Sequence, residues 1–258
     1  MCLLVVAWQS HPRYRLIVAG NRDEFHERPT APMGWWSDES GVLAGRDLRA
    51  GGTWLGLARS GRFGLVTNFR EADAATRADA PSRGELVPAF LRNGNGAAPF
   101  LDTLQARATQ YAGFNLLLGD AAGLHYYTNV GGTAPRVLGP GIYGLSNHRL
   151  DEPWPKLVRT RERFAAALHD SGPAPAVLLD LLGDSTPAAL DTAPDAGLPV
   201  DLERALSAPF VRHERYGTRC STVVLVTHDG STTVYERRFE PTGAQSGASR
   251  LEFAGHAG

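Results

Sequence analysis

The chain has 258 residues, a length that suits one large domain or two small ones. With 43% hydrophobic and 21% charged residues, it falls outside the composition of mostly disordered chains. Its 26 Lys+Arg against 27 Asp+Glu give a net charge of −1, which argues against nucleic acid as an electrostatic partner and against a polybasic membrane anchor.

The N-terminal part of the sequence predicts short strands. The first two apolar runs are separated by His11-Pro12, which is typical of the turn of a β-hairpin. Residues 21–52 are polar and rich in Gly and Pro, and we expect a covering loop there. A charged stretch at 70–84 predicts an exposed loop. The strands predicted in this part are 2–8, 14–20, 54–58 and 63–67.

The remainder predicts helices and strands in successive groups, which is typical of an α+β protein rather than of alternating βαβ units. We therefore expect one domain over 1–258: a four-layer αββα sandwich of two antiparallel sheets between helical layers. Residues 183–210 predict a connection or lid, and 241–258 a flexible tail. The predicted helices are 84–91, 100–111, 155–168 and 175–182. The predicted strands are 113–118, 124–128, 136–138, 142–145, 221–227 and 232–238.

The cysteine and lysine content bears on the cellular compartment and on the genome that encodes the chain. Two cysteines, Cys2 and Cys220, do not make a disulfide scaffold, and the first residues lack the basic segment of a signal peptide. The first apolar run is too short to span a membrane, so a cytoplasmic protein is expected. Lys156 is the only lysine, a bias that indicates a GC-rich bacterial genome. Neither a metal nor another cofactor is predicted, because no zinc set or H-E-x-x-H occurs.

Cys2 is the first candidate for chemistry. A small residue after Met1 normally leads to removal of the methionine, which would place Cys2 at the N-terminus. Its thiol could then attack a carbonyl while its own α-amine, with a pKa near 8, takes the thiol proton. The alternative is that Cys2 is merely a small apolar residue that opens a strand.

The polar run Asn21-Arg22-Asp23-Glu24 follows the second predicted strand. In a hairpin, the end of strand two lies beside the start of strand one, so Asp23 could reach the Cys2 amine. A solvated turn is the alternative interpretation.

Asn68 and Asn147 each come at or just past the end of an apolar strand. We expect one to supply a side-chain amide and the other a backbone N–H to an oxyanion, although Asn is also a common turn residue. Arginines near these strand ends, Arg70 and Arg219 among them, suit an anionic ligand.

Several of these segments together resemble the NRDE family, also called the transport and Golgi organisation protein 2 family. The likeness covers nearly the whole chain apart from 170–210. The segments are Met1-Cys2, Asn21–Glu24, the Gly51–Gly56 run GGTWLG, Asn68–Arg70, Phe114–Leu117 and Leu145–Asn147.

The resemblance implies a branch of the N-terminal nucleophile hydrolases, with Cys2, Asp23, Asn68 and Asn147 in the catalytic positions. Gly20 stands where the related acylases have an arginine, and Arg22 is a candidate replacement. The implied activity is hydrolysis of an amide or thioester of a small anionic or acyl substrate, with Asn21, Arg22, Glu24, Arg70 and Arg219 binding it.

Two other functions remain open at this level. The family is also linked to haem and to acyl-coenzyme A or lipid homeostasis, so a carrier without turnover is the main alternative. A structural adaptor with a peripheral Cys2 is the third. The expected partner is a small molecule, and the sequence predicts no particular oligomeric state.

Overall fold

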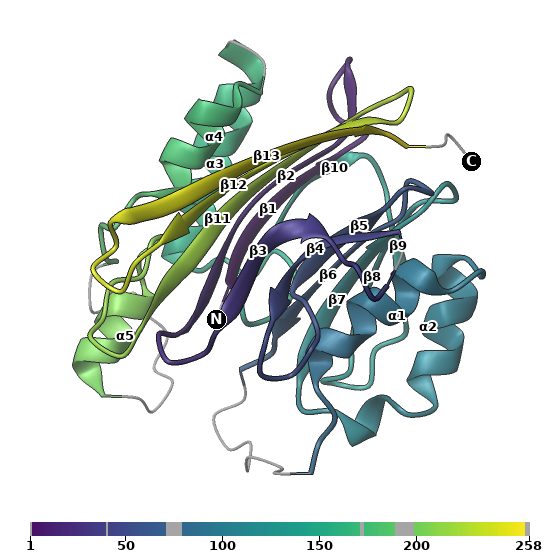
Figure 1. Ribbon diagram of the computed structural model, residues 1–258, viewed down its shortest axis with the longest axis horizontal. Coiled ribbons are helices and arrows are strands. Elements are labelled where there is room, and N and C mark those ends of the chain that lie inside the picture. Colours follow the sequence, from purple (N-terminus) through teal and green to yellow (C-terminus); the bar gives the residue numbers. More distant parts are fainter. Residues whose placement is uncertain (1, 40, 71–78, 171–172, 189–198, 256–258) are drawn as a thin grey trace.

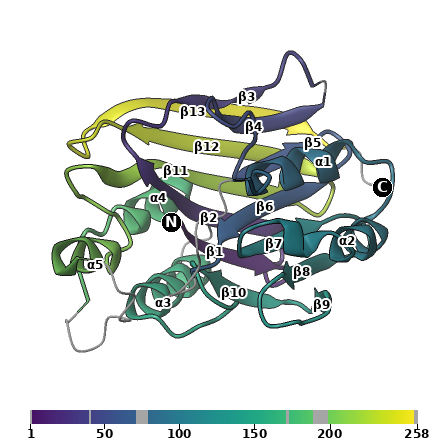
Figure 2. The same ribbon diagram turned by 90° about the horizontal axis from the view of Figure 1, so that it is seen from below.

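The computed structural model describes residues 2–39, 41–70, 79–170, 173–188 and 199–255. Two antiparallel sheets pack face to face in this structure, with helices on both outer faces (Figures 1 and 2). The predicted αββα sandwich is therefore confirmed. No described helix combines the length and apolar character needed to cross a bilayer.

The first sheet places the N-terminal hairpin at its centre, in the order β10-β1-β2-β11-β12-β13. Cys2 pairs with Arg22 and Leu4 with Gly20, as the hairpin prediction requires. The strands are β1 (Cys2–Trp8), β2 (Tyr14–Phe25), β10 (Gly141–Leu145), β11 (Tyr216–Thr227), β12 (Ser231–Phe239) and β13 (Gln245–Ala254).

The second sheet is a meander in which each strand pairs with the next one along the chain, in the order β3 to β9. Figure 1 shows it facing the first sheet, with β3 lying near β13. Its strands are β3 (Thr30–Trp35), β4 (Val42–Asp47), β5 (Leu55–Ala58), β6 (Phe63–Asn68), β7 (Phe114–Gly119), β8 (Leu124–Thr128) and β9 (Arg136–Leu138).

The alternation of side chains along β1 separates the layers. Cys2 and Leu4 belong to the core between the sheets, whereas Val5 belongs to the core under the outer helices. Helices α3 (Pro155–Asp170) and α4 (Pro175–Leu182) cover the first sheet, where Phe164 is fully buried. Helices α1 (Leu86–Arg92) and α2 (Ala97–Gln105) cover the second. The remaining helical segments are α5 (Val200–Leu206), η1 (Arg83–Glu85) and η2 (Ala108–Gln110).

Two predictions of irregular structure are wrong. Residues 21–52 contain the end of β2 and all of β3 and β4, because the polar side chains of β2 find buried partners on β11. The expected flexible tail instead contains β13, whose Leu251 and Phe253 pack against the inter-sheet core while the alternate residues face solvent. The lid expected at 183–210 contains α5, and residues 189–198 lie outside the described part of the chain.

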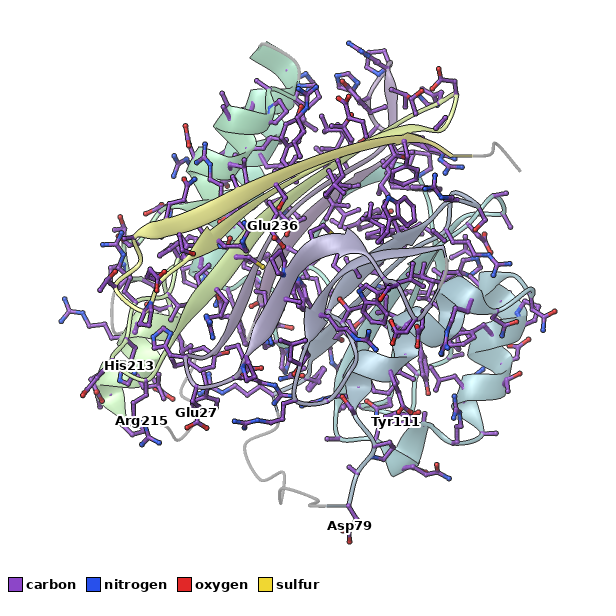
Figure 3. The ribbon with its side chains drawn as sticks, viewed as in Figure 1. Glu27, Asp79, Tyr111, His213, Arg215 and Glu236 are labelled. Carbon is purple, nitrogen blue, oxygen red and sulfur yellow. The ribbon has the colours of Figure 1, made fainter. Side chains whose placement is uncertain are left out.

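Buried polar groups also join the sheets. Glu236, on β12 beside the edge strand β13 (Figure 3), accepts a hydrogen bond from the Met33 backbone N–H of β3 at 3.0 Å. Asn115 on β7 donates to Thr67 on β6 and to the His148 carbonyl beyond β10, at 3.2 and 2.8 Å. Because unpaired buried polar groups are costly, these bonds fix how the sheets meet.

Candidate functional site

The two residues that follow β10, Ser146 and Asn147, hold the backbone of Cys2. The Cys2 N–H donates to Asn147 Oδ1 at 3.0 Å, and the Ser146 hydroxyl donates to the Cys2 carbonyl at 2.9 Å. Asn147 in turn donates from Nδ2 to the carbonyl of Asn68 at 2.9 Å. A chain of hydrogen bonds therefore connects three of the four predicted catalytic residues: Cys2, Asn147 and Asn68.

Asp23 completes the predicted catalytic set beside the start of β1. Its Oδ1 accepts a 2.7 Å hydrogen bond from the Thr218 hydroxyl, and its carbonyl accepts one from Tyr216 at 2.6 Å. Burial raises the pKa of Asp23, while the Lys156 ammonium opposes that shift. Burial conversely lowers the pKa of Lys156, and the Asp23 carboxylate opposes it. The charges of Asp23 and Lys156 thus influence each other in the interior. Lys156 is not among the site residues predicted from the sequence.

Burial dominates the titration of both cysteines. It raises the pKa of the Cys2 thiol, and the Arg22 guanidinium and an N–H of the Asp23 backbone act in the opposite direction. Burial also raises the pKa of Cys220 far above its ordinary value. Cys2 lines a cavity that is open to ligands and Cys220 does not, so only Cys2 is placed for chemistry.

The cavity in front of Cys2 has a volume of about 660 Å³, which is large enough for a small-molecule ligand. The side chain of Asn68 is exposed towards it. Among the described residues it is lined by Cys2, Arg22, Asp23, Glu24, Phe25, Arg28, Asp47, Ala50, Thr53, Trp54, Val66, Asn68, Phe69, Ala80, Pro81, Ser82, Arg83, Gly84, Ala112 and Gly113. Polar and aromatic groups thus share its walls.

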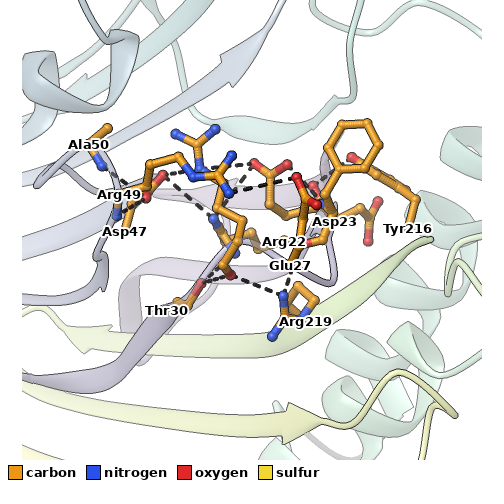
Figure 4. Close-up of polar contacts among 12 residues, drawn as sticks. Arg22, Asp23, Glu27, Thr30, Asp47, Arg49, Ala50, Tyr216 and Arg219 are labelled. Carbon is orange, nitrogen blue, oxygen red and sulfur yellow. Dashed lines mark hydrogen bonds and ion pairs between the residues drawn. The ribbon is translucent and has the colours of Figure 1, made fainter.

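Arg22 lies at the centre of a charged cluster on this wall (Figure 4). Its guanidinium stacks on the Trp54 ring, 4.5 Å from the centroid, and donates to the Thr30 hydroxyl at 3.0 Å. It also lies 3.7 Å from the Glu24 carboxylate and 3.8 Å from that of Asp47. Arg22 and Glu24 therefore line the cavity, and that they bind a substrate there stays a prediction.

The motif GGTWLG has a packing role in building this wall. The backbone of Gly84 approaches Gly52 so closely that a Cβ on Gly52 would lie 2.4 Å from the Gly84 carbonyl. The Thr53 N–H also donates to that carbonyl at 2.9 Å. Gly45 leaves room for the Trp54 ring, since a Cβ there would lie 2.3 Å from it. Gly45 and Gly52 thus set the position of Trp54, on whose ring the Arg22 guanidinium stacks.

Asn21, one of the predicted substrate-binding residues, is turned away from the cavity. Its side chain donates to the carbonyls of Leu182 and Pro209 at 2.9 Å each, and its Oδ1 accepts from the Ser221 hydroxyl at 2.6 Å. Along a strand, successive side chains point to opposite faces, so Arg22 and Asn21 cannot both face the ligand. Asn21 instead fastens the first sheet to the loops around α4 and α5.

Arg70 and Arg219 also lie outside the cavity, contrary to their prediction as ligand contacts. Arg70 lies 3.6 Å from Glu203 on α5. Arg219 sits at a bulge of β11, and its Nη1 donates to three carbonyls of the β2–β3 turn at 3.0–3.2 Å (Figure 4). A bulged residue has no partner across the ladder, so its side chain is free to close the turn.

Other cavity residues were missed by the sequence analysis, notably Arg28, Asp47 and Arg83. Arg28 and Asp47 lie in the segment predicted as a covering loop, and they pair at 2.6 Å. Arg83 lies within 70–84, the segment predicted as an exposed loop, of which 71–78 lie outside the described residues. The sequence signal that points to Arg28 and Asp47 is the prediction that 21–52 forms a covering loop. Among the residues the structure describes, no three His, Cys, Asp or Glu side chains gather to hold a metal ion.

The layer order and the inner strand that begins at Cys2 define an N-terminal nucleophile hydrolase-like fold. A solved structure with the same fold is a Caenorhabditis elegans N-acylethanolamine-hydrolyzing acid amidase ortholog. It matches with a TM-score of 0.52 at 11% sequence identity, over 87% of this chain and 92% of that chain.

The chain belongs to the Transport and Golgi organisation 2 family, whose family model matches residues 1–241. The Mus musculus and Homo sapiens homologs are each 36% identical over 259 residues, covering 92% of this chain and 92% of theirs. The Drosophila melanogaster protein is 29% identical over 249 residues, covering 88% of each. The family resemblance is thus confirmed, while the bacterial origin stays a prediction.

Proposed function

We propose that this protein is a cysteine hydrolase that cleaves an amide or thioester bond through Cys2. The observation that carries the proposal is the contact between the Cys2 nitrogen and Asn147 Oδ1, 3.0 Å apart, beside a cavity of about 660 Å³. Removal of Met1 would turn that backbone nitrogen into an α-amine without moving it. A nucleophile and a base would then belong to one residue.

The reaction would proceed in two halves. In the first, the α-amine takes the proton of the thiol, and the sulfur attacks the carbonyl carbon to form a tetrahedral oxyanion. The α-ammonium then protonates the leaving amine or thiol, and an acyl thioester remains on Cys2. In the second half, water attacks that thioester, the amine accepts its proton, and the acid leaves as the thiol is restored.

The surrounding groups suit these steps. Asn147 Oδ1 would hold the amine, and the neighbouring Asp23 carboxylate would favour its ammonium form, because an opposite charge nearby stabilises the charged state. The exposed side-chain amide of Asn68 is the available oxyanion donor, because the following N–H groups are already used. The Phe69 N–H donates to the Gly113 carbonyl, and the Arg70 N–H to that of Asn147.

The decisive experiment is intact-mass analysis of the purified protein after exposure to a panel of amide and thioester acyl donors. We expect a mass that lacks one methionine and then gains a single acyl group, mapped to Cys2. Cys2→Ser should lose the adduct and turnover, since a hydroxyl is a far poorer nucleophile near neutral pH. Cys220→Ser is the matched control and should leave both unchanged.

The same experiment separates the hydrolase from the carrier. Donors that bind without ever acylating Cys2 would favour a carrier of haem or acyl-coenzyme A, and retained Met1 in the native host would exclude the amine as base. A cytoplasmic location remains part of this proposal.

A further inference from the structure

Three arginines line the cavity, and they differ in how they are paired. Arg22 and Arg28 each lie within 3.8 Å of both Glu24 and Asp47, so two cations and two anions form a balanced cluster. Arg83 has no carboxylate within ion-pair distance in the described part of the chain. The lining carboxylates Asp23, Glu24 and Asp47 equal the three arginines in number, but Arg83 is the lining arginine that forms no ion pair with a described carboxylate.

Arg83 is also held in place before any ligand arrives. Its Nη1 donates to the carbonyl of Gly113 at 2.9 Å, and the other N–H donors of the guanidinium have no hydrogen-bond partner among the described residues. The next residue, Gly84, is pinned against Gly52, and its carbonyl accepts the Thr53 N–H at 2.9 Å. A side chain fixed at both its base and its tip loses little entropy when it binds.

The guanidinium faces the same space as Cys2. Burial lowers the pKa of Arg83, the charges of Glu24 and of the Cys2 thiolate favour its charged form, and the charge of Arg28 opposes it. Its electrostatic range thus includes the sulfur and two members of the balanced cluster, Glu24 and Arg28. A half-buried arginine with spare donors suits an oxyanion, because the fork geometry permits two parallel hydrogen bonds.

Building on the function proposed above, we propose that Arg83 anchors an oxyanion of the ligand, a carboxylate or a phosphate, in the cavity next to Cys2. The anion would give Arg83 the direct ion pair that it lacks among the described residues, and the scissile carbonyl would lie between Arg83 and Asn68. Arg83 then becomes the residue that selects acidic over neutral substrates.

The test uses two alkylating probes of similar size, iodoacetate and iodoacetamide, which differ in charge. Each reacts with the Cys2 thiolate, and the rate is read by peptide mass spectrometry. The ratio of the two rates cancels changes in thiol pKa or exposure, so a purely structural role of Arg83 would leave it unchanged. Because turnover is not needed, the ratio remains informative even where the hydrolase proposal fails.

Arg83→Gln should lower the iodoacetate-to-iodoacetamide ratio by about tenfold, the scale of a lost hydrogen-bonded charge contact. Arg83→Lys should lower it less, because the charge remains while the fork is lost. Arg107→Gln is the matched control: Arg107 is exposed and does not line the cavity, yet the net charge changes equally. Its ratio should equal that of the native protein.

Protection of Cys2 from iodoacetamide then identifies the oxyanion. Octanoate and octyl phosphate are compared with neutral octanamide in the native protein and in Arg83→Gln. Protection by either anion that disappears in Arg83→Gln supports the anchor and assigns carboxylate or phosphate. Equal alkylation ratios in native protein and Arg83→Gln would overturn the proposal, and so would protection by neither anion.

Discussion

Asp23 and Lys156 should depend on each other energetically, because both charges are almost completely withdrawn from water. Their exposed fractions are 2% and 3%. Asp23 accepts a hydrogen bond from Thr218 at 2.7 Å, and Lys156 Nζ donates to the Leu206 carbonyl at 2.7 Å. Solvent screening is weak at such depth, so removing one charge leaves the other in a poorly compensating environment.

The perturbation is Asp23→Asn, which keeps the shape and removes the charge. Breaking a buried pair typically costs about 3–5 kcal/mol, and we expect about 3 kcal/mol here because Leu206 still accepts from Lys156. For a chain of this size the melting temperature should fall by about 6–12 °C. The double variant Asp23→Asn/Lys156→Met should recover about 2 kcal/mol relative to the sum of the single changes.

The pH dependence follows from the lowered pKa of Lys156. Between its folded pKa and its ordinary value, the unfolded chain binds more protons, so stability rises with pH through that window. Asp23→Asn removes a charge that supports the ammonium, which lowers the folded pKa further and extends the window to lower pH. The stability deficit of Asp23→Asn should therefore shrink between pH 7 and pH 9.

The assay is urea unfolding of the native protein, both single variants and the double variant at pH 7 and pH 9. Single effects that add to within about 0.5 kcal/mol would show that the two residues are independent. A deficit of equal size at both pH values would show that the substitution leaves the protonation of Lys156 in the folded state unchanged. Either result would refute the coupling.

Three further outcomes are expected. Gly52→Ala should destabilise by about 2 kcal/mol in urea unfolding, since its Cβ would meet Gly84 at 2.4 Å, whereas Gly94→Ala, with open space around it, should not. Arg219→Gln should lower the free energy of unfolding by about 1–2 kcal/mol, because three carbonyls of the β2–β3 turn lose their donor. It should keep the native iodoacetate-to-iodoacetamide ratio. While Met1 is retained, the pH–rate midpoint for alkylation of Cys2 should lie above that of an ordinary thiol; a lower midpoint would contradict the effect of burial.

The parts of the site that sequence could predict are those set by local pairing. A hairpin between the first two apolar runs is enough to place Asp23 beside Cys2, and strand ends are enough to place Asn68 and Asn147. The αββα order could likewise be inferred from the grouping of strands and helices. These features depend on near neighbours in the chain or on one strand contact.

The parts that failed depend on contacts between distant segments. Strands β3 and β4 carry Gly, Pro and polar residues, and they form because the sheet edge offers partners that composition does not reveal. Arg83 faces the cavity because Gly84 meets Gly52, a contact across 32 positions. Arg219 was assigned to the ligand because a strand end looked equivalent to the others, and only the pairing with β2 shows that it is a bulge.

That bulge explains how four polar residues in succession can all be satisfied on β2. Thr218 pairs with Asp23 and Ser221 with Asn21, and both hydroxyls donate to side chains on the helix-covered face. Thr218 and Ser221 are three residues apart, so in a regular strand they would point to opposite faces. The extra residue at Arg219 restores their common orientation and turns its own side chain to the β2–β3 turn. One inserted residue thus aligns both buried hydroxyls, and it leaves Arg22 and Glu24 free to line the cavity of Cys2.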